Sequence, residues 1–147
     1  MTVLRHIVVF CLFLLAAIGN GYFFDYLNAR YFHYPATDNN LGDFSGIGKA
    51  FMIIVIAPVA ETAFLNLLPN VLLTRLRVRN TALLILIPSA LFSLMHWYPP
   101  LYVAMTFFAG MILNGYYLYC QRRTKDYFVL VALLHAAYNA YGYFIVN

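Results

Sequence analysis

Five apolar stretches, separated by polar connections of which only residues 25–49 form a long one, occupy most of this 147-residue chain. A helix needs roughly 17 to 25 mainly apolar residues to cross the hydrocarbon core of a bilayer, and only the third stretch is shorter than that. We therefore expect an all-α, polytopic membrane helix bundle of about five transmembrane helices, forming one integral membrane domain over residues 1–147. The expected spans are residues 7–24, 50–73, 81–95, 100–120 and 127–146.

Composition excludes the main soluble classes. Hydrophobic residues make up 64% of the chain, charged residues make up 10%, and the mean hydropathy is +0.76. A water-soluble fold of this length could not bury so much apolar surface, which excludes a soluble enzyme, a disordered chain and a disulfide-rich secreted module. The basic residues lie in the connections instead of along one polar face, so we expect no nucleic-acid partner.

Lysine and arginine predict the orientation of the bundle. Seven of the nine basic residues flank one side of the expected spans and two flank the other. The seven are Arg5, Arg75, Arg77, Arg79, Arg122, Arg123 and Lys125, and the two are Arg30 and Lys49. Cytoplasmic connections carry the excess of positive charge, so we expect a cytoplasmic N-terminus. The expected location is the cytoplasmic membrane of a bacterium or archaeon.

The first span has a second interpretation. Arg5 and His6, an apolar run and then Ala17-Ile18-Gly19 also resemble a signal peptide with its cleavage site. The apolar run continues beyond that site to Phe24, so we expect this segment to be retained as a span.

One acid stands inside an apolar stretch. The other four acids, Asp25, Asp38, Asp43 and Asp126, fall in the expected connections, so Glu61 is the only carboxylate expected within a span. A charged side chain at membrane depth costs roughly 2.5 to 3.5 kcal/mol, and such a residue usually has a function. Pro58, three residues earlier, removes one backbone donor and predicts either a simple kink or an opening of the helix beside Glu61.

Two of the four histidines lie at membrane depth. His96 ends the third stretch and His135 lies within the fifth, whereas His6 and His33 lie at a span end and in a connection. His135 and Asn139 are four residues apart, which places both on one face of a helix, one turn from each other. That spacing would let the two side chains point at a single ligand atom.

Helix geometry predicts which of these groups meet. Counting about 1.5 Å per residue from the span ends places Glu61 and His135 at the same depth in a core of about 30 Å. The same count places His96 roughly 10 Å closer to the outer side, unless its helix is tilted or is bent at Pro88. We therefore expect Glu61 and His135 to be close, and the depth of His96 is a discrepancy that a tilt or bend of its helix would remove.

Three amide side chains also lie within the apolar stretches. Asn66 and Asn70 belong to the second stretch, and Asn114 belongs to the fourth. An amide at membrane depth most often hydrogen-bonds to a neighbouring helix, so we expect that role for all three instead of a role in the site.

A carboxylate, two imidazoles and an amide suit the hydrolysis of a peptide bond. A carboxylate assisted by an imidazole can deprotonate a water, and the remaining groups can donate hydrogen bonds to the oxyanion that forms. The same composition suits catalytic zinc, which leaves a zinc site at Glu61, His96 and His135 open. Since no HExxH motif is present, we expect no cofactor.

Three short motifs carry a family resemblance. They are Glu61-Thr62-Ala63-Phe64-Leu65-Asn66 preceded by Ala57-Pro58, then Phe92 with His96, then His135 with Asn139. In this order they resemble the EExxxR, FxxxH and HxxxN motifs of the CPBP intramembrane proteases, the family of the CAAX prenyl endopeptidases and the bacteriocin self-immunity proteins. The resemblance covers residues 57–139 and implies that Glu61 is the catalytic glutamate working with His96. It also implies that His135 and Asn139 hold the oxyanion.

The first motif departs from the family pattern at two positions. Thr62 stands where a second Glu is usual, and Asn66 stands where an Arg is usual. The loss of the Arg removes a charge that could orient the helices or the carboxylate.

The favoured function is an intramembrane endopeptidase that cleaves a membrane-anchored protein or peptide by Glu-activated water. The expected partners are that substrate and the lipid bilayer. An alternative, favoured by Thr62 and Asn66, is a non-catalytic binding, immunity or assembly factor of the same family. A third interpretation is a small transporter or proton-relay subunit, because a membrane Glu beside His also suits proton movement.

Overall fold

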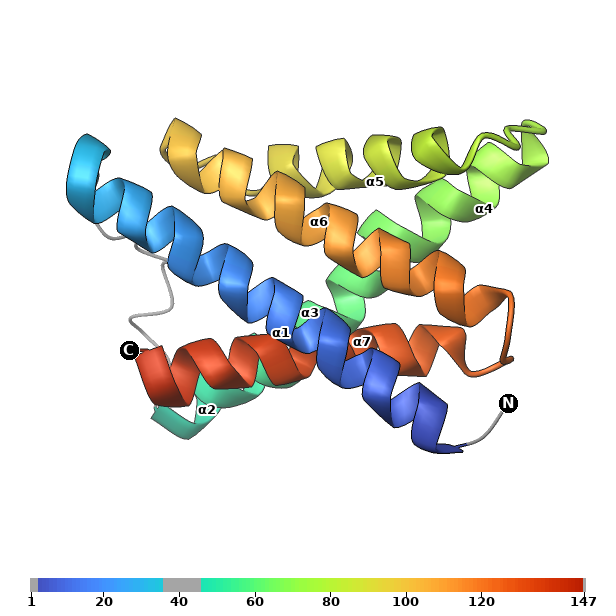
Figure 1. The fold of residues 1–147 in the computed structure, drawn as a ribbon, viewed down its shortest axis with the longest axis horizontal. Coiled ribbons are helices and arrows are strands. Elements are labelled where there is room, and N and C mark those ends of the chain that lie inside the picture. The colour runs from blue at the N-terminus through green and yellow to red at the C-terminus, as the bar shows by residue number, and fades with distance from the viewer. Residues whose placement is uncertain (1–2, 36–45, 147) are drawn as a thin grey trace.

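Helices occupy all five apolar stretches in the computed structural model, which describes residues 3–35 and 46–146. Within these residues there are helices and no strands, so the predicted all-α fold is confirmed (Figure 1). The α-helices are α1 (Val3–Leu27), α2 (Gly46–Phe51), α3 (Ala57–Glu61), α4 (Leu68–Arg75), α5 (Thr81–Met95), α6 (Pro100–Gln121) and α7 (Tyr127–Tyr141). Wider π-helical turns continue them at η1 (Asn28–Phe32), η2 (Met52–Ile56), η3 (Thr62–Leu67) and η4 (Gly142–Val146).

Four continuous helices in the described part of the chain are long and apolar enough to cross a membrane. They are Val3–Phe32, Gly46–Arg75, Pro100–Gln121 and Tyr127–Val146. Helix α5 is also apolar but has only 15 residues, in line with the short third stretch of the sequence. The helices therefore fit an integral membrane protein.

The first helix is longer than predicted. Helix α1 and η1 continue to Phe32, so Asp25 lies in a helix, and its assignment to a connection is wrong. A single exposed carboxylate does not stop a helix whose neighbouring residues are largely aromatic and apolar, because the charge can face away from the packed side. Glu61 is therefore not the only acid on a membrane-length helix. Asp126 precedes α7 as predicted, while Asp38 and Asp43 lie outside the described residues.

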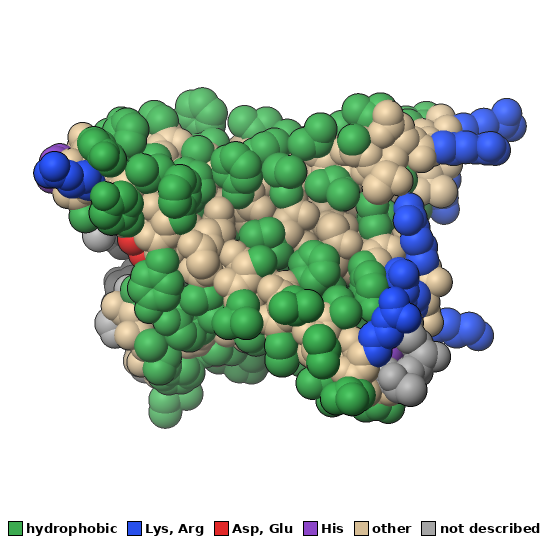
Figure 2. All heavy atoms as spheres, viewed as in Figure 1, with side chains coloured by type: hydrophobic (Ala, Val, Ile, Leu, Met, Phe, Trp, Pro, Cys, Tyr) green, Lys and Arg blue, Asp and Glu red, His purple; other side chains and the backbone are tan. Residues whose placement is uncertain are grey.

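Helix α6 contacts most of the bundle. It packs against α5, α1 and α7, and the continuous helix from α2 to α4 runs obliquely past α7 to reach α5 (Figure 1). Figure 2 shows hydrophobic side chains spread over the middle of the visible face, with Lys and Arg gathered mainly at the end where α4 leads into α5. This uneven charge is the pattern on which the predicted orientation depends.

The core lies between α5, α6 and α7. Its buried members are Leu84, Phe92, Leu113, Tyr116, Tyr117, Leu118, Cys120, Val131 and Leu134. Helices α5 and α6 pack closely at Gly110, where an added Cβ would lie 3.0 Å from the Cα of Ser89. A glycine at this crossing lets the two backbones come together, as small residues do between membrane helices.

Buried amides link the core helices. The Asn70 side chain donates to the Asn114 side-chain oxygen at 3.1 Å, and the Asn114 amide donates to the Ser89 hydroxyl at 3.4 Å. The predicted interhelical role is therefore confirmed for Asn70 and Asn114. The Asn66 amide is also buried but makes no side-chain hydrogen bond within the described residues.

These amides lead to a stability prediction. Asn114→Leu should lower the free energy of unfolding by about 1 kcal/mol, because it breaks the contacts between α4, α5 and α6. Asn66→Leu is the matched control, and it should leave stability unchanged or raise it, since its amide is buried without a partner among the described residues. Denaturant unfolding in mixed micelles would measure both variants, and equal losses would contradict the assignment.

Candidate active site

Glu61 lies in the continuous helix that runs from α2 to α4, between the wide π-helical turns η2 and η3. In η2 the Ala57 N–H donates to the Met52 carbonyl, a bond that spans five residues instead of four. The next bond of that pattern would need an N–H at position 58, and Pro58 has none. The Ile53 carbonyl is therefore left without that backbone donor. Proline thus opens the backbone just before the short helix α3, which Glu61 ends.

Asn139 supplies the missing donor. Its side-chain Nδ2 donates to the Ile53 carbonyl at 2.9 Å, joining α7 to η2. Sequence reasoning expected Asn139 to face the reacting atoms together with His135, and it did not foresee this contact. An amide nitrogen carries two N–H groups, so the bond to Ile53 occupies one of them.

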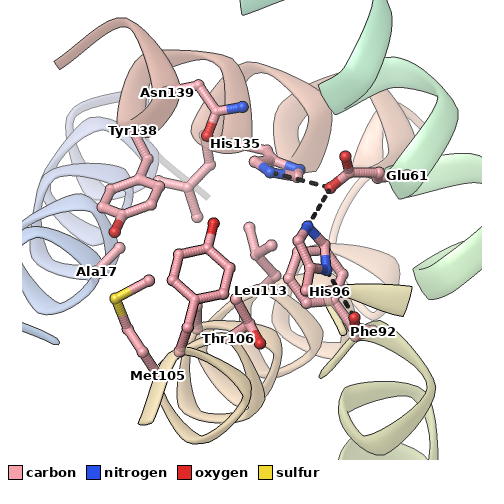
Figure 3. Close-up of a pocket in the computed structure, with 13 residues that line it drawn as sticks. Ala17, Glu61, Phe92, His96, Met105, Thr106, Leu113, His135, Tyr138 and Asn139 are labelled. Carbon is pink, nitrogen blue, oxygen red and sulfur yellow. Dashed lines mark hydrogen bonds and ion pairs between the residues drawn. The ribbon is translucent and has the colours of Figure 1, made fainter. Parts of the chain in front are cut away.

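Three side chains from three helices converge on one point. The Glu61 Oε2 lies 3.6 Å from His135 Nε2 and 3.8 Å from His96 Nε2. Figure 3 shows Glu61, His96 and His135 pointing toward one another from α3, the end of α5 and α7. The exposed fraction of the side chain is 25% for Glu61, 19% for His96 and 5% for His135, so the carboxylate is the most accessible of the three groups.

His96 lies closer to Glu61 than the simple depth count along straight helices indicated, with its Nε2 3.8 Å from the Glu61 Oε2. Side chains on a helix lean toward its N-terminus, so a residue at the end of α5 reaches back toward the middle of the bundle. The His96 ring does this, because its Nδ1 bonds the Phe92 carbonyl one turn earlier at 2.7 Å. A carbonyl only accepts, so Nδ1 carries the proton, and in the neutral ring Nε2 presents a lone pair toward Glu61.

The converging groups line one cavity of about 150 Å³. All four predicted site residues, Glu61, His96, His135 and Asn139, are part of its wall. Its other lining residues are Ala17, Phe92, Tyr102, Met105, Thr106, Ala109, Leu113, Leu134 and Tyr138. The cavity can hold small polar groups beside an accessible carboxylate.

Sequence reasoning missed the polar residues Tyr102, Thr106 and Tyr138 in this wall. Tyr138 lies three residues after His135, a spacing that places both on one helix face and could have revealed it. No comparable signal existed for Tyr102 and Thr106, since they enter from α6, which carries no residue of the three motifs.

Neither departure from the first motif touches the cavity. Thr62 and Asn66 are completely buried in η3, and neither lines the space around Glu61. Their side-chain polar atoms make no hydrogen bond among the described residues. Neutral side chains at these two positions suit a buried environment, in which an unpaired charge would be costly.

The side chains around Glu61 can be compared with the arrangement that a metal ion needs. In the described part of the chain, no group of three or more His, Cys, Asp and Glu side chains is arranged to hold a metal ion. The His96 and His135 side chains each lie within 4 Å of the Glu61 carboxylate, but the three groups are not arranged as a ligand set.

The Asn139 contact yields a second stability prediction. Asn139→Asp removes the donor to Ile53, and it should lower the free energy of unfolding by about 1 to 3 kcal/mol because two oxygens then face each other. Asn80→Asp is the matched control, since the Asn80 side chain accepts from the Ala82 N–H and Asp accepts equally well. Both are measured by denaturant unfolding in micelles. A similar loss in the two variants would argue against a donor role for Asn139.

Comparison with known proteins gives one match. A family model described as Type II CAAX prenyl endopeptidase Rce1-like matches residues 44–141, which is two thirds of the chain. A search of curated proteins and a search of solved structures gave no match. The matched range includes every residue of the Glu61, His96, His135 and Asn139 cluster.

Proposed function

Because the chain belongs to the Rce1-like family of Type II CAAX prenyl endopeptidases, we propose that it is an intramembrane endopeptidase that uses Glu61 to activate water. The observation that carries the proposal is the convergence of Glu61 with two imidazoles on the wall of a cavity. The family is a protease family, and the helices fit a membrane protein. The use of Glu61 and the activity of this chain are the proposal.

Water activation follows from the two acceptors that face each other. The Glu61 Oε2 and the His96 Nε2 are 3.8 Å apart, too far for a direct hydrogen bond but close enough for one water to bridge. Such a water donates one hydrogen to each group. Its oxygen then attacks the peptide carbonyl carbon while Glu61 accepts the proton, and the Phe92 carbonyl keeps His96 in the accepting tautomer.

The remaining groups stabilise the product of that attack. The carbonyl oxygen becomes an oxyanion, to which the His135 Nε2–H and the second N–H of Asn139 donate. Cleavage of the C–N bond then releases an amine, which takes the proton held by Glu61. These donors act in a partly dry site, where hydrogen bonds to a developing charge are stronger than in water.

We propose a membrane-anchored protein or peptide as the substrate. Such a chain would enter between helices from the bilayer and present its peptide bond to the cavity. Retained activity is supported by Thr62 and Asn66, which lie outside the cavity wall. The gathering of Lys and Arg at one end supports a cytoplasmic N-terminus (Figure 2), and we propose the cytoplasmic membrane of a bacterium or archaeon as the location.

The decisive experiment compares protein termini in native cells. Membrane and secreted proteomes are collected from cells with the wild-type chain, with Glu61→Gln or with a deletion. The proposal expects a terminus present only with the wild type and lost equally in the other two. If Glu61→Gln behaves like the wild type while the deletion has a phenotype, the protease assignment fails and a binding or assembly role replaces it.

We propose further that hydrolysis needs no metal. Purified protein should contain sub-stoichiometric zinc by elemental analysis, and its activity should survive chelator treatment. Stoichiometric zinc that is lost in His96→Ala and His135→Ala, together with activity restored by added zinc, would support the zinc site instead.

A further inference from the structure

A second cavity lies beside the catalytic one. Its volume is about 230 Å³, and its wall includes Tyr22, Asp25, Tyr102, Met105, Tyr138 and Tyr141. Tyr102, Met105 and Tyr138 line both cavities. A peptide held at Glu61 therefore has a neighbouring cavity beside it, and the two cavities share these three side chains in their walls.

Asp25 supplies the charge of the second cavity. Its carboxylate is exposed and makes no ion pair or hydrogen bond within the described residues. Arg30, the nearest basic residue in sequence, lies over the Tyr31 ring with its guanidinium carbon 5.9 Å from the ring centroid. Residues 36–45, which follow η1 in sequence, contain no Lys, Arg or His. The carboxylate is thus available to a cation from outside the chain.

Aromatic rings supply the rest of the polar wall. Four tyrosines, Tyr22, Tyr102, Tyr138 and Tyr141, line the cavity together with Asp25. The Tyr22 and Tyr141 hydroxyls lie 2.6 Å apart, and the two rings meet edge to face at 6.4 Å, so this pair holds its position. Aromatic faces attract a cation, and a carboxylate at the same place adds direct charge complementarity.

The dimensions favour one side chain as the occupant. Pockets for drug-sized molecules span roughly 300 to 1,000 Å³, and this cavity is smaller. We propose that it is a subsite that binds a Lys or Arg side chain of the substrate, near the peptide bond to be cleaved. This inference rests on the proposed function, since it names a feature of the peptide that the catalytic cavity would receive. The shared wall favours a peptide over a lipid amine as the source of the cation.

Binding can be tested without catalysis. The protein carries Glu61→Gln, which prevents cleavage, and is held in uncharged maltoside micelles. The probes are acetylated and amidated six-residue peptides of Leu and Ala that carry one Lys at successive positions, each with a norleucine twin. For at least one position, the Lys peptide should bind about tenfold more tightly than its twin, as measured by calorimetry.

Substitutions assign that preference to Asp25. Asp25→Asn should abolish it while leaving the affinity of the norleucine peptides unchanged, which shows that the site is still folded. Asp25→Glu should retain part of it. Asp126→Asn, an exposed carboxylate just before α7, should leave it intact. Added phosphatidylethanolamine should not compete with the Lys peptide.

Several results would overturn the subsite. These are equal binding of the twins at every position, no binding of any peptide, a Lys preference that survives Asp25→Asn, or displacement by phosphatidylethanolamine. The proposed function fails separately. If the protein prefers Lys peptides but cleaves nothing, the subsite is supported and the protease function is contradicted. If it cleaves peptides without a Lys preference, the protease function is supported and the subsite is contradicted.

Discussion

Glu61→Gln is expected to slow peptide hydrolysis by about 10²- to 10⁴-fold, the range typical for loss of a general base. Gln has the shape of Glu but cannot accept the proton of the attacking water, and its amide would donate toward the His96 Nε2 lone pair instead. The side chain is 25% exposed, so the neutral amide should not disturb the fold. Initial rates are measured in bilayer nanodiscs on the peptide identified by the comparison of termini.

Two further variants serve as an intermediate case and a control for the Glu61→Gln measurement. Glu61→Asp keeps the carboxylate but withdraws it by one methylene, so its rate should fall between those of the wild type and Glu61→Gln. Asp126→Asn removes an exposed carboxylate from the connection before α7 and should leave the rate unchanged. A Glu61→Gln rate within about threefold of the wild type would show that another group activates the water.

Gly110→Val is expected to lower the free energy of unfolding by about 1 to 3 kcal/mol and to reduce hydrolysis as well. A Cβ at this position would lie 3.0 Å from the Ser89 Cα and 3.2 Å from its Cβ, and the extra methyl groups of Val increase the overlap. Ser89 is completely buried, so α5 must shift. Because α5 ends at Met95, that shift would move His96 relative to Glu61.

Gly19→Val is the matched control for this crossing. An added Cβ at Gly19 meets no atom within 4 Å, and the residue is exposed on α1, so only a small change in stability is expected. Denaturant unfolding and initial rates are recorded for both variants. Equal stabilities would mean that α5 and α6 can separate at Gly110 without loss, and the close crossing would then not position His96.

The positions of the helices were predictable because the bilayer restricts what a chain can do. Unpaired backbone groups are too costly in hydrocarbon, so apolar stretches of sufficient length become helices whatever their tertiary contacts. The same cost makes a membrane carboxylate conspicuous, which is why Glu61 stood out. Asp25 was wrongly assigned to a connection because this cost is absent near the end of a span. A charge there can face solvent, so composition does not show where the helix ends.

The arrangement of the site was predictable only in part. The spacings of Phe92 with His96 and of His135 with Asn139 indicated shared helix faces, and all four predicted site residues line one cavity. The short distance between His96 and Glu61 was not predictable by counting the rise per residue along each helix. It depends on how the His96 ring turns back to bond the Phe92 carbonyl. The contact of Asn139 with Ile53 required knowing which backbone carbonyl Pro58 leaves open.

The sequence by itself determined the helical membrane class and singled out Glu61, His96, His135 and Asn139, because hydropathy and helix periodicity are local properties. The tertiary structure decided which groups face one another. It placed Tyr102 and Tyr138 between two cavities, buried Thr62 and Asn66 away from Glu61, and joined Asp25 to an aromatic wall. Those relations depend on helix crossings such as the one at Gly110, where contact between residues distant in sequence sets the geometry.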